Sequence, residues 1–282
     1  MSMNKLMEFR TTYLRAIAKA WAEPAFEDKL IESPTGTLLD YFGFDWGSWQ
    51  NACTLHIVSA GRSARPGDTT GDGLPPGRFE WIGDEWVWSK NLLDTLTMYL
   101  PLTAPSAGAA ERAMALADYY GQRASLFDDD WGTEYGPAGK KPILITPALG
   151  SQSGTPIGGF VPADQGFEAF KVVLLAAIAK AWASDDFKQM LLIDCAAALR
   201  TIRGYRLPWN MNLCVMNDDG ARWTKPDASS DPPSKGQSYW TFSRPHALTL
   251  YLPTAPSDES AEPVALAVYN ATGAEYPFTC CC

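Results

Sequence analysis

A seven-residue segment, Ala-Ile-Ala-Lys-Ala-Trp-Ala, occurs twice in this chain, at residues 16–22 and 177–183. The offset of 161 positions continues without a gap on both sides of the segment. It aligns Leu14 with Leu175, Phe26 with Phe187, Leu30 with Leu191, Gly43 with Gly204 and Cys53 with Cys214. Repetition at a fixed period indicates that the chain contains two copies of one module.

The duplication continues toward the C-terminus at a shorter offset. Residues 96–101 match residues 248–253 at an offset of 152, so the second copy is nine residues shorter between the two blocks. We place this deletion in the loop rich in glycine and proline at residues 61–77. Beyond the last matching block only the second copy carries cysteines, in the final sequence Thr-Cys-Cys-Cys.

The repeats and the composition between them predict the domain organisation. Residues 1–125 form the first module, 126–163 a linker rich in small residues and proline, and 164–255 the second module. Residues 256–282 form a C-terminal tail that contains the cysteine cluster.

Each module begins with a helical pattern and continues with strands. Leu14, Ile17 and Trp21 share one helical face, and Pro24 is typical of the first position of a second helix. Gly43 and Gly204 are expected to end helices, Asp185 to cap one, and residues 107–124 to add another. Strands are expected at 54–58, 79–82, 86–88, 96–100, 213–216, 239–242 and 248–252. The predicted fold class is α+β, with two tandem modules, each a helical hairpin followed by a small antiparallel sheet, and a flexible C-terminal tail.

Charge and hydropathy narrow the range of partners. The chain has 23 basic and 32 acidic residues, for a net charge of -9, and contains no basic run. Nucleic acid and anionic membrane surfaces are therefore not expected as partners. The apolar run 172–179 is far shorter than the roughly 20 residues that cross a bilayer, so we expect no membrane insertion. The N-terminal residues have no signal-peptide pattern, which predicts a cytoplasmic protein.

Candidate catalytic and metal-binding residues are few. The only histidines, His56 and His246, are expected to be structural. Cys53 and His56 would point to opposite faces of a strand, so we expect no metal site there, and we expect no cofactor. Cys195 should pack as a small apolar residue, and Cys53 and Cys214 should share one packing role because the offset aligns them. The many tryptophans favour packing within the modules, and a docking edge for a partner by strand addition remains an alternative.

The two helical segments resemble a known family. Ala-Trp-Ala, Pro-Ala-Phe, Leu-Ile-Glu-Ser-Pro and Leu-Leu-Asp-Tyr-Phe-Gly-Phe, within residues 20–44, are similar to the N-terminal part of the nitrile hydratase alpha subunit. Residues 181–208 carry a second match, ending in Gly-Tyr-Arg-Leu-Pro. The metal-binding Cys-x-x-Cys-Ser-Cys motif of that enzyme is absent. The resemblance therefore implies the fold, and a role as the leader of a natural-product precursor, without hydratase chemistry.

Together with the Thr-Cys-Cys-Cys terminus, these leader-like modules resemble precursors of thiazole/oxazole-modified microcins (TOMMs), including bacteriocins with long nitrile-hydratase-like leaders. The resemblance implies a substrate and not an enzyme. It also implies a YcaO-type cyclodehydratase that uses ATP and a flavin dehydrogenase as modifying enzymes. A protease and an exporter would release and secrete the product.

The residues that the resemblance marks for modification are Thr279, Cys280, Cys281 and Cys282. A cysteine thiolate reaches the carbonyl of the preceding residue and closes a five-membered ring, whereas a threonine hydroxyl does so less readily. Three alternatives stay open: an oxidised or copper-binding cysteine peptide, a non-catalytic interaction module, and a degenerate protein of the nitrile hydratase type.

Overall fold

The computed structural model describes residues 5–51, 53–60, 79–88, 93–123, 167–207, 211–225 and 238–272. The chain divides into two compact units. Unit 1 comprises Met1–Thr97, Trp209–Asn212 and Ala247–Cys282, and unit 2 comprises Met98–Pro208 and Leu213–His246. Both contain helices and antiparallel strands, which confirms the α+β class.

Unit 1 begins with three helices, where the sequence predicted a hairpin of two. They are α1 (Lys5–Ala22), α2 (Pro24–Glu32) and α3 (Pro34–Phe42). Pro24 and Pro34 each occupy a first helical position, where the missing N–H of proline costs no hydrogen bond. Gly43 ends α3 in the left-handed region at φ 71°, as predicted. The sequence prediction missed the third helix, although Ser33 is its N-cap residue and Pro34 its first helical residue.

Unit 2 contains the equivalent helices α6 (Phe167–Ala183), α7 (Asp185–Ile193) and α8 (Cys195–Arg200). The cap predicted at Asp185 is wrong by one residue. Ser184 has the extended backbone of an N-cap, and its hydroxyl accepts a hydrogen bond from the Phe187 N–H at 3.2 Å. Asp185 is already the first helical residue, so it contributes only negative charge to the first turn.

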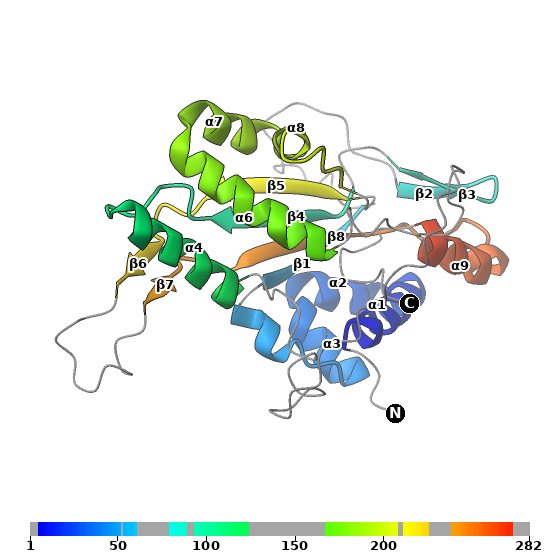
Figure 1. Ribbon diagram of the computed structural model, residues 1–282. Coiled ribbons are helices and arrows are strands. Elements are labelled where there is room, and N and C mark those ends of the chain that lie inside the picture. The colour runs from blue at the N-terminus through cyan, green and yellow to red at the C-terminus, as the bar shows by residue number, and fades with distance from the viewer. Residues whose placement is uncertain are drawn as a thin grey trace, which may run out of the picture. The chain divides into compact units, whose positions relative to one another are not determined.

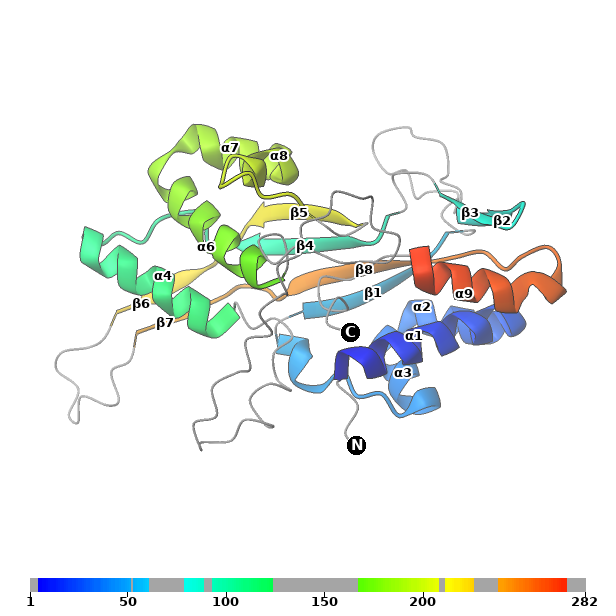
Figure 2. The same cartoon turned by 45° about the vertical axis from the view of Figure 1, so that its right-hand side comes forward.

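Strands pack against these helices within each unit (Figures 1 and 2). In unit 1, β8 (His246–Leu252, from Ala247 on) lies between β1 (Cys53–Ser59) and the first half of β4 (Thr95–Leu100). β4 and β8 are antiparallel, with Thr95 opposite Thr249 and Thr97 opposite Ala247. In unit 2, the second half of β4 pairs with β5 (Asn212–Asn217). Alternate residues of β8 are buried, as expected for a sheet with one covered face.

Each unit also has a two-stranded hairpin. In unit 1, β2 (Phe79–Ile82) pairs with β3 (Glu85–Trp88), and in unit 2, β6 (Arg222–Thr224) pairs with β7 (Tyr239–Thr241). Trp81 faces Trp86 in the first hairpin, and Trp223 faces Trp240 in the second. The strand β6 was not predicted.

The two hairpins differ in their connections. Gly83 and Asp84, both at positive φ, form the tight turn of the first hairpin, as a two-residue hairpin connection requires. In the second copy the hairpin loop is longer, and the connection between β5 and β6 is short. The deletion predicted at 61–77 therefore lies in the correct loop, but it is not the only change, because the hairpin loop of the second copy gains residues.

A C-terminal helix completes each unit. The helix expected at 107–124 is α4 (Ala109–Arg123), in unit 2. Unit 1 contains η4 (Glu259–Ala261) and α9 (Glu262–Thr272), within the segment assigned to the tail. The described scaffold therefore reaches Thr272, well into residues 256–282.

The compact units do not coincide with the sequence copies. Unit 1 joins the helices α1–α3 of the first copy to β8 and α9 of the second, and α9 lies alongside α1 (Figures 1 and 2). Unit 2 joins α6–α8 of the second copy to α4 of the first, and α4 lies alongside α6. The two copies have therefore exchanged their C-terminal segments, and the predicted module boundaries describe the duplication of the sequence.

Half of the tryptophans whose side-chain burial is described are core residues, and the other half are partly exposed. In unit 1, Trp46 and Trp49 pack edge to face with ring centroids 5.1 Å apart, and both contact Phe9. In unit 2, Trp240 lies between Trp182 and Phe242. Aromatic pairs of this kind stabilise cores beyond the area that they bury. None of the helices within the described residues is long and apolar enough to cross a membrane.

Candidate functional site

The residues predicted to be modified, Thr279 to Cys282, lie outside the described part of the chain. The described residues end at Thr272, the last residue of α9. The surroundings of α9 in unit 1 are therefore the part of the candidate site that the structure places.

Arg10 on α1 holds the C-terminal end of α9. Its Nε donates a hydrogen bond to Asn270 Oδ1 at 2.7 Å, and its guanidinium also donates to the Asn270 carbonyl oxygen. The last carbonyls of a helix have no partner within the helix, and a cation there also interacts favourably with the helix dipole. Arg10 thus fixes the last described turn of the chain onto the first copy.

The other face of α9 is buried in unit 1. Trp86 Nε1 donates to the Ala265 carbonyl oxygen at 2.8 Å, and the Ala265 side chain is fully buried. The Tyr269 ring packs against Phe79 and Trp86, with centroids 5.8 Å and 6.2 Å away. Burial, together with Tyr269 and Asp94, holds the pKa of the Tyr13 hydroxyl well above its usual value. The Tyr13 hydroxyl beside Tyr269 is therefore uncharged at physiological pH.

His246 is a structural residue, as predicted. It is 1% exposed, and its Nδ1 accepts a hydrogen bond from the Tyr99 N–H at 3.0 Å. Burial, and secondarily Arg123, lowers its pKa to about 3, so the ring stays neutral. In unit 1 the equivalent residue is Asp94, whose Oδ1 accepts from the Tyr251 N–H at 2.7 Å. Both side chains cap a strand amide, and the other histidine, His56, is exposed on β1.

The three described cysteines are free thiols in different environments. Cys53 and Cys195 are buried, and burial raises the pKa of Cys195 to about 12, with Cys214 and Asp194 adding to the effect. Cys214 is exposed, and partial burial of its thiol raises its pKa as well. A raised pKa disfavours the reactive thiolate. Among residues that the structure describes, no group of three or more metal-ligating side chains comes together.

The predicted equivalence of Cys53 and Cys214 is wrong. In unit 1 the Ala60 N–H donates to the Leu252 carbonyl, and in unit 2 the Asp218 N–H donates to the Leu100 carbonyl. Since Leu100 and Leu252 are equivalent, Ala60 corresponds to Asp218, an offset of 158 and not 161. The difference is odd, so it reverses the faces of the strand. Cys53 is accordingly fully buried, whereas Cys214 is exposed.

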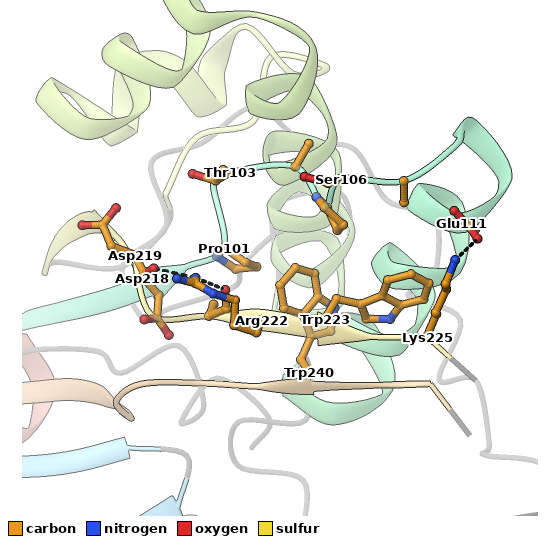
Figure 3. Close-up of a pocket in the computed structure, with 14 residues that line it drawn as sticks. Pro101, Thr103, Ser106, Glu111, Asp218, Asp219, Arg222, Trp223, Lys225 and Trp240 are labelled. Atoms are coloured by element: carbon orange, nitrogen blue, oxygen red, sulfur yellow. Dashed lines mark hydrogen bonds and ion pairs between the residues drawn. The ribbon is translucent and has the colours of Figure 1, made fainter. Parts of the chain in front are cut away.

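Unit 2 contains an open pocket of about 530 Å³ that the sequence did not indicate (Figure 3). Trp223 and Trp240 form its floor, and the Lys225–Glu111 ion pair, at 3.2 Å, spans one end. The Gly108 N–H and Lys225 lower the pKa of Glu111, so this carboxylate is ionised and is no proton donor at neutral pH.

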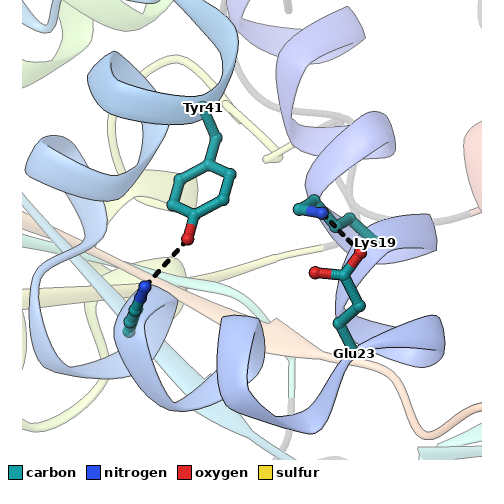
Figure 4. Close-up of polar contacts among 4 residues, drawn as sticks. Lys19, Glu23 and Tyr41 are labelled. Carbon is teal, nitrogen blue, oxygen red and sulfur yellow. Dashed lines mark hydrogen bonds and ion pairs between the residues drawn. The ribbon is translucent and has the colours of Figure 1, made fainter.

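An exposed face of α1–α3 distinguishes the first copy from the second (Figure 4). Lys29 Nζ donates to the Tyr41 hydroxyl at 2.9 Å, and Lys19 forms an ion pair with Glu23 at 2.6 Å. Both lysine ammonium groups lie 5.4 Å from the centroid of the Tyr41 ring. The offset of 161 places Met190 and Ile202 at the positions of Lys29 and Tyr41. The two copies thus present different chemistry on one surface.

The described residues form a duplicated scaffold that anchors the helix α9. Its family is established by comparison with known proteins: the model described as "ribosomal natural product, two-chain TOMM family" matches residues 4–127 and 165–277. The chain belongs to this family. No curated protein and no solved structure matches.

The family match establishes several earlier predictions. The protein is a ribosomal natural-product precursor, and the two matched segments confirm the duplicated module. Membership also implies that modifying enzymes act in its biosynthetic pathway. Residues 278–282, with the three cysteines, follow directly after the second matched segment.

Proposed function

We propose that this precursor is modified at Thr279, Cys280, Cys281 and Cys282, and that the preceding chain is the leader that presents them. The observation that carries the proposal is the position of the cysteine cluster. It follows the second matched segment, and only the second copy ends in cysteines. The helix before it is fixed to the scaffold by Arg10.

The chemistry is azoline formation followed, in part, by oxidation. The Cys280 sulfur bonds to the carbonyl carbon of Thr279, the carbonyl oxygen leaves with the thiol and amide protons as one water, and a C=N bond forms to the Cys280 nitrogen. Hydrolysis of ATP to ADP and phosphate at the cyclodehydratase drives this step. Cys281 and Cys282 act in the same way on the carbonyls of Cys280 and Cys281. Thr279 is a slower fourth site through its hydroxyl, because that hydroxyl is far less acidic than a thiol. A flavin dehydrogenase then removes two hydrogens from an azoline to give the aromatic ring.

The other cysteines are poor substrates for this reaction. Cys53 and Cys195 are buried, and the high pKa of Cys195 disfavours its thiolate. Cys214 is exposed but lies within β5, where a ring formed with the Leu213 carbonyl would break the strand. The terminal cysteines therefore fit the chemistry better than any described cysteine.

The partners follow from this proposal. A YcaO-type cyclodehydratase and a flavin dehydrogenase would act on the chain in the cytoplasm. A protease would then separate leader and product, and an exporter would secrete the product.

The proposal is tested by the mass of the C-terminal proteolytic fragment of the full chain, purified under reducing conditions from cells that express the modifying enzymes. We expect the loss of one water for each ring, and of two further hydrogens for each aromatic ring, confined to residues 278–282. Replacing Cys280, Cys281 and Cys282 by alanine should abolish the losses. The matched control, Cys214→Ala, should leave them unchanged.

Losses that persist in the triple variant, or that map to another part of the chain, would show that the modified residues lie elsewhere. An unmodified tail in the presence of active enzymes would favour a metal-binding or interaction module.

A further inference from the structure

We infer that the helices of the first copy, and not those of the second, carry the cysteine tail. The inference rests on the proposed function, since it assigns the leader role for that tail to one part of the scaffold. In sequence the second copy stands next to the tail, so it would be the obvious leader. The structure exchanges the C-terminal segments and reverses this assignment.

The segment that ends at the tail, here called the second-copy arm, comprises residues 247–272 and includes most of β8 and all of α9. It is held in unit 1 by side chains of the first copy. Trp21 Nε1 donates to the Pro253 carbonyl at 2.8 Å, and Trp86 Nε1 donates to the Ala265 carbonyl at 2.8 Å. Arg10 adds its hydrogen bonds to Asn270, two residues before the end of α9.

These contacts hold the whole length of the arm. They occur after β8, at the start of α9 and in its last turn, and each of them is made by a side chain of the first copy. The first copy therefore determines the position of Thr272, the last described residue before the tail. We therefore expect a modifying enzyme that binds the scaffold and acts on the tail to bind unit 1.

The first-copy arm, residues 98–123, is the matched counterpart in unit 2. Trp182 Nε1 donates to the Pro101 carbonyl at 2.6 Å, and Trp240 Nε1 donates to the Ala115 carbonyl at 2.6 Å. These residues correspond one by one to those that hold the second-copy arm. The first-copy arm leads into the linker and not into the cysteines. The chain thus contains two similarly docked arms, and the cysteine tail follows the second-copy arm.

This symmetry provides a matched pair of variants. Ala265 on α9 and Ala115 on α4 are equivalent and are both fully buried. Glutamate at either position places a charge against an apolar surface and should detach the arm concerned. Each variant is made in the full chain and expressed with the modifying enzymes. Hydrogen exchange at α9 and α4 reports which arm has detached.

With Ala265→Glu we expect the extent of tail modification at a fixed time to fall at least about tenfold, since a buried charge shifts docking by well over a factor of ten. With Ala115→Glu we expect the extent of tail modification to stay within about twofold of that in the unaltered chain, although α4 is detached to about the same degree as α9 is in Ala265→Glu. An equal loss in both variants, or normal modification when α9 exchanges freely, would overturn the inference.

If Ala265→Glu unfolds the entire chain, a milder pair of variants tests which copy carries the tail. Arg10→Met removes the hydrogen bonds to Asn270, and Lys171→Met changes the equivalent position of α6. We expect slower modification only with Arg10→Met, and equal rates in the two variants would overturn the inference. A failure of the proposed function itself is distinct, since the tail of the unaltered chain would then remain unmodified.

Discussion

At the scale of single residues, the scaffold uses polar side chains to complete its backbone hydrogen bonds. Asp94 and His246 occupy equivalent positions and accept hydrogen bonds from equivalent strand amides, although their chemistry differs. Sequence analysis assigned His246 a structural role, but the strand amide that it caps depends on pairing between distant segments. His246 can accept this bond only as a neutral ring, which makes its contribution to stability dependent on pH.

The pKa of His246 is lowered from 6.5 to about 3 in the folded chain, so the unfolded chain binds more protons between these values. Its contribution to stability is complete above pH 6.5 and is lost progressively as the pH falls toward 3. The slope is at most about 1.4 kcal/mol for each pH unit. Urea unfolding of the wild type and of His246→Gln at several pH values measures this dependence of the free energy of unfolding on pH.

The free energy of unfolding of His246→Gln should depend less steeply on pH in this interval. His56→Gln is the control, because His56 is exposed on β1, and it should follow the wild type. Parallel curves for His246→Gln and the wild type would contradict the assignment of a buried neutral ring.

At the scale of secondary-structure elements, sequence signals located most helices and strands but not all of their ends. Pro24 and Gly43 act as predicted, because proline geometry and left-handed glycine are local properties of the chain. The helix α3 and the strand β6 were missed, and the cap of α7 was placed one residue late. β6 has only three residues and gains its hydrogen bonds from β7, beyond a long loop.

The position of the α7 cap can be tested by mutation. Ser184→Ala should lower the free energy of unfolding by about 1 kcal/mol, since it removes the hydrogen bond to the Phe187 N–H. Asp185→Ala should cost less, because that side chain contributes only its charge near the start of the helix. Urea unfolding of both variants provides the comparison. A larger loss with Asp185→Ala would favour the cap predicted from sequence.

At the scale of the whole molecule, the exchange of C-terminal arms joins both halves of the sequence in each compact unit. The linker between the copies therefore need not be intact for the halves to remain together. This arrangement gives a prediction that is independent of any modifying enzyme.

A specific protease site inserted between residues 126 and 163 should allow the folded chain to be cut without separating the two fragments. They should elute together in size-exclusion chromatography, under reducing conditions, and separate only in denaturant, because each unit contains core residues from both fragments. Native separation into two smaller species would contradict the exchange. The uncut chain carrying the same insertion is the control for any effect of the insertion itself.

The sequence by itself determined the duplication, the α+β class, the apolar faces of the helices and the helix-ending role of Gly43, and it supplied the candidate residues for modification. These are properties of spacing and residue type. Gly204, which was also expected to end a helix, lies beyond the end of α8. Which copy each arm docks on was decided only by the tertiary structure. Trp21 could equally donate to Pro101 or to Pro253, since both follow the same sequence block, and the structure pairs it with Pro253. The two copies present nearly the same docking residues, so an arm could dock on the helices of its own copy or on those of the other copy with the same local contacts. The three-dimensional path of the chain selects between these two arrangements.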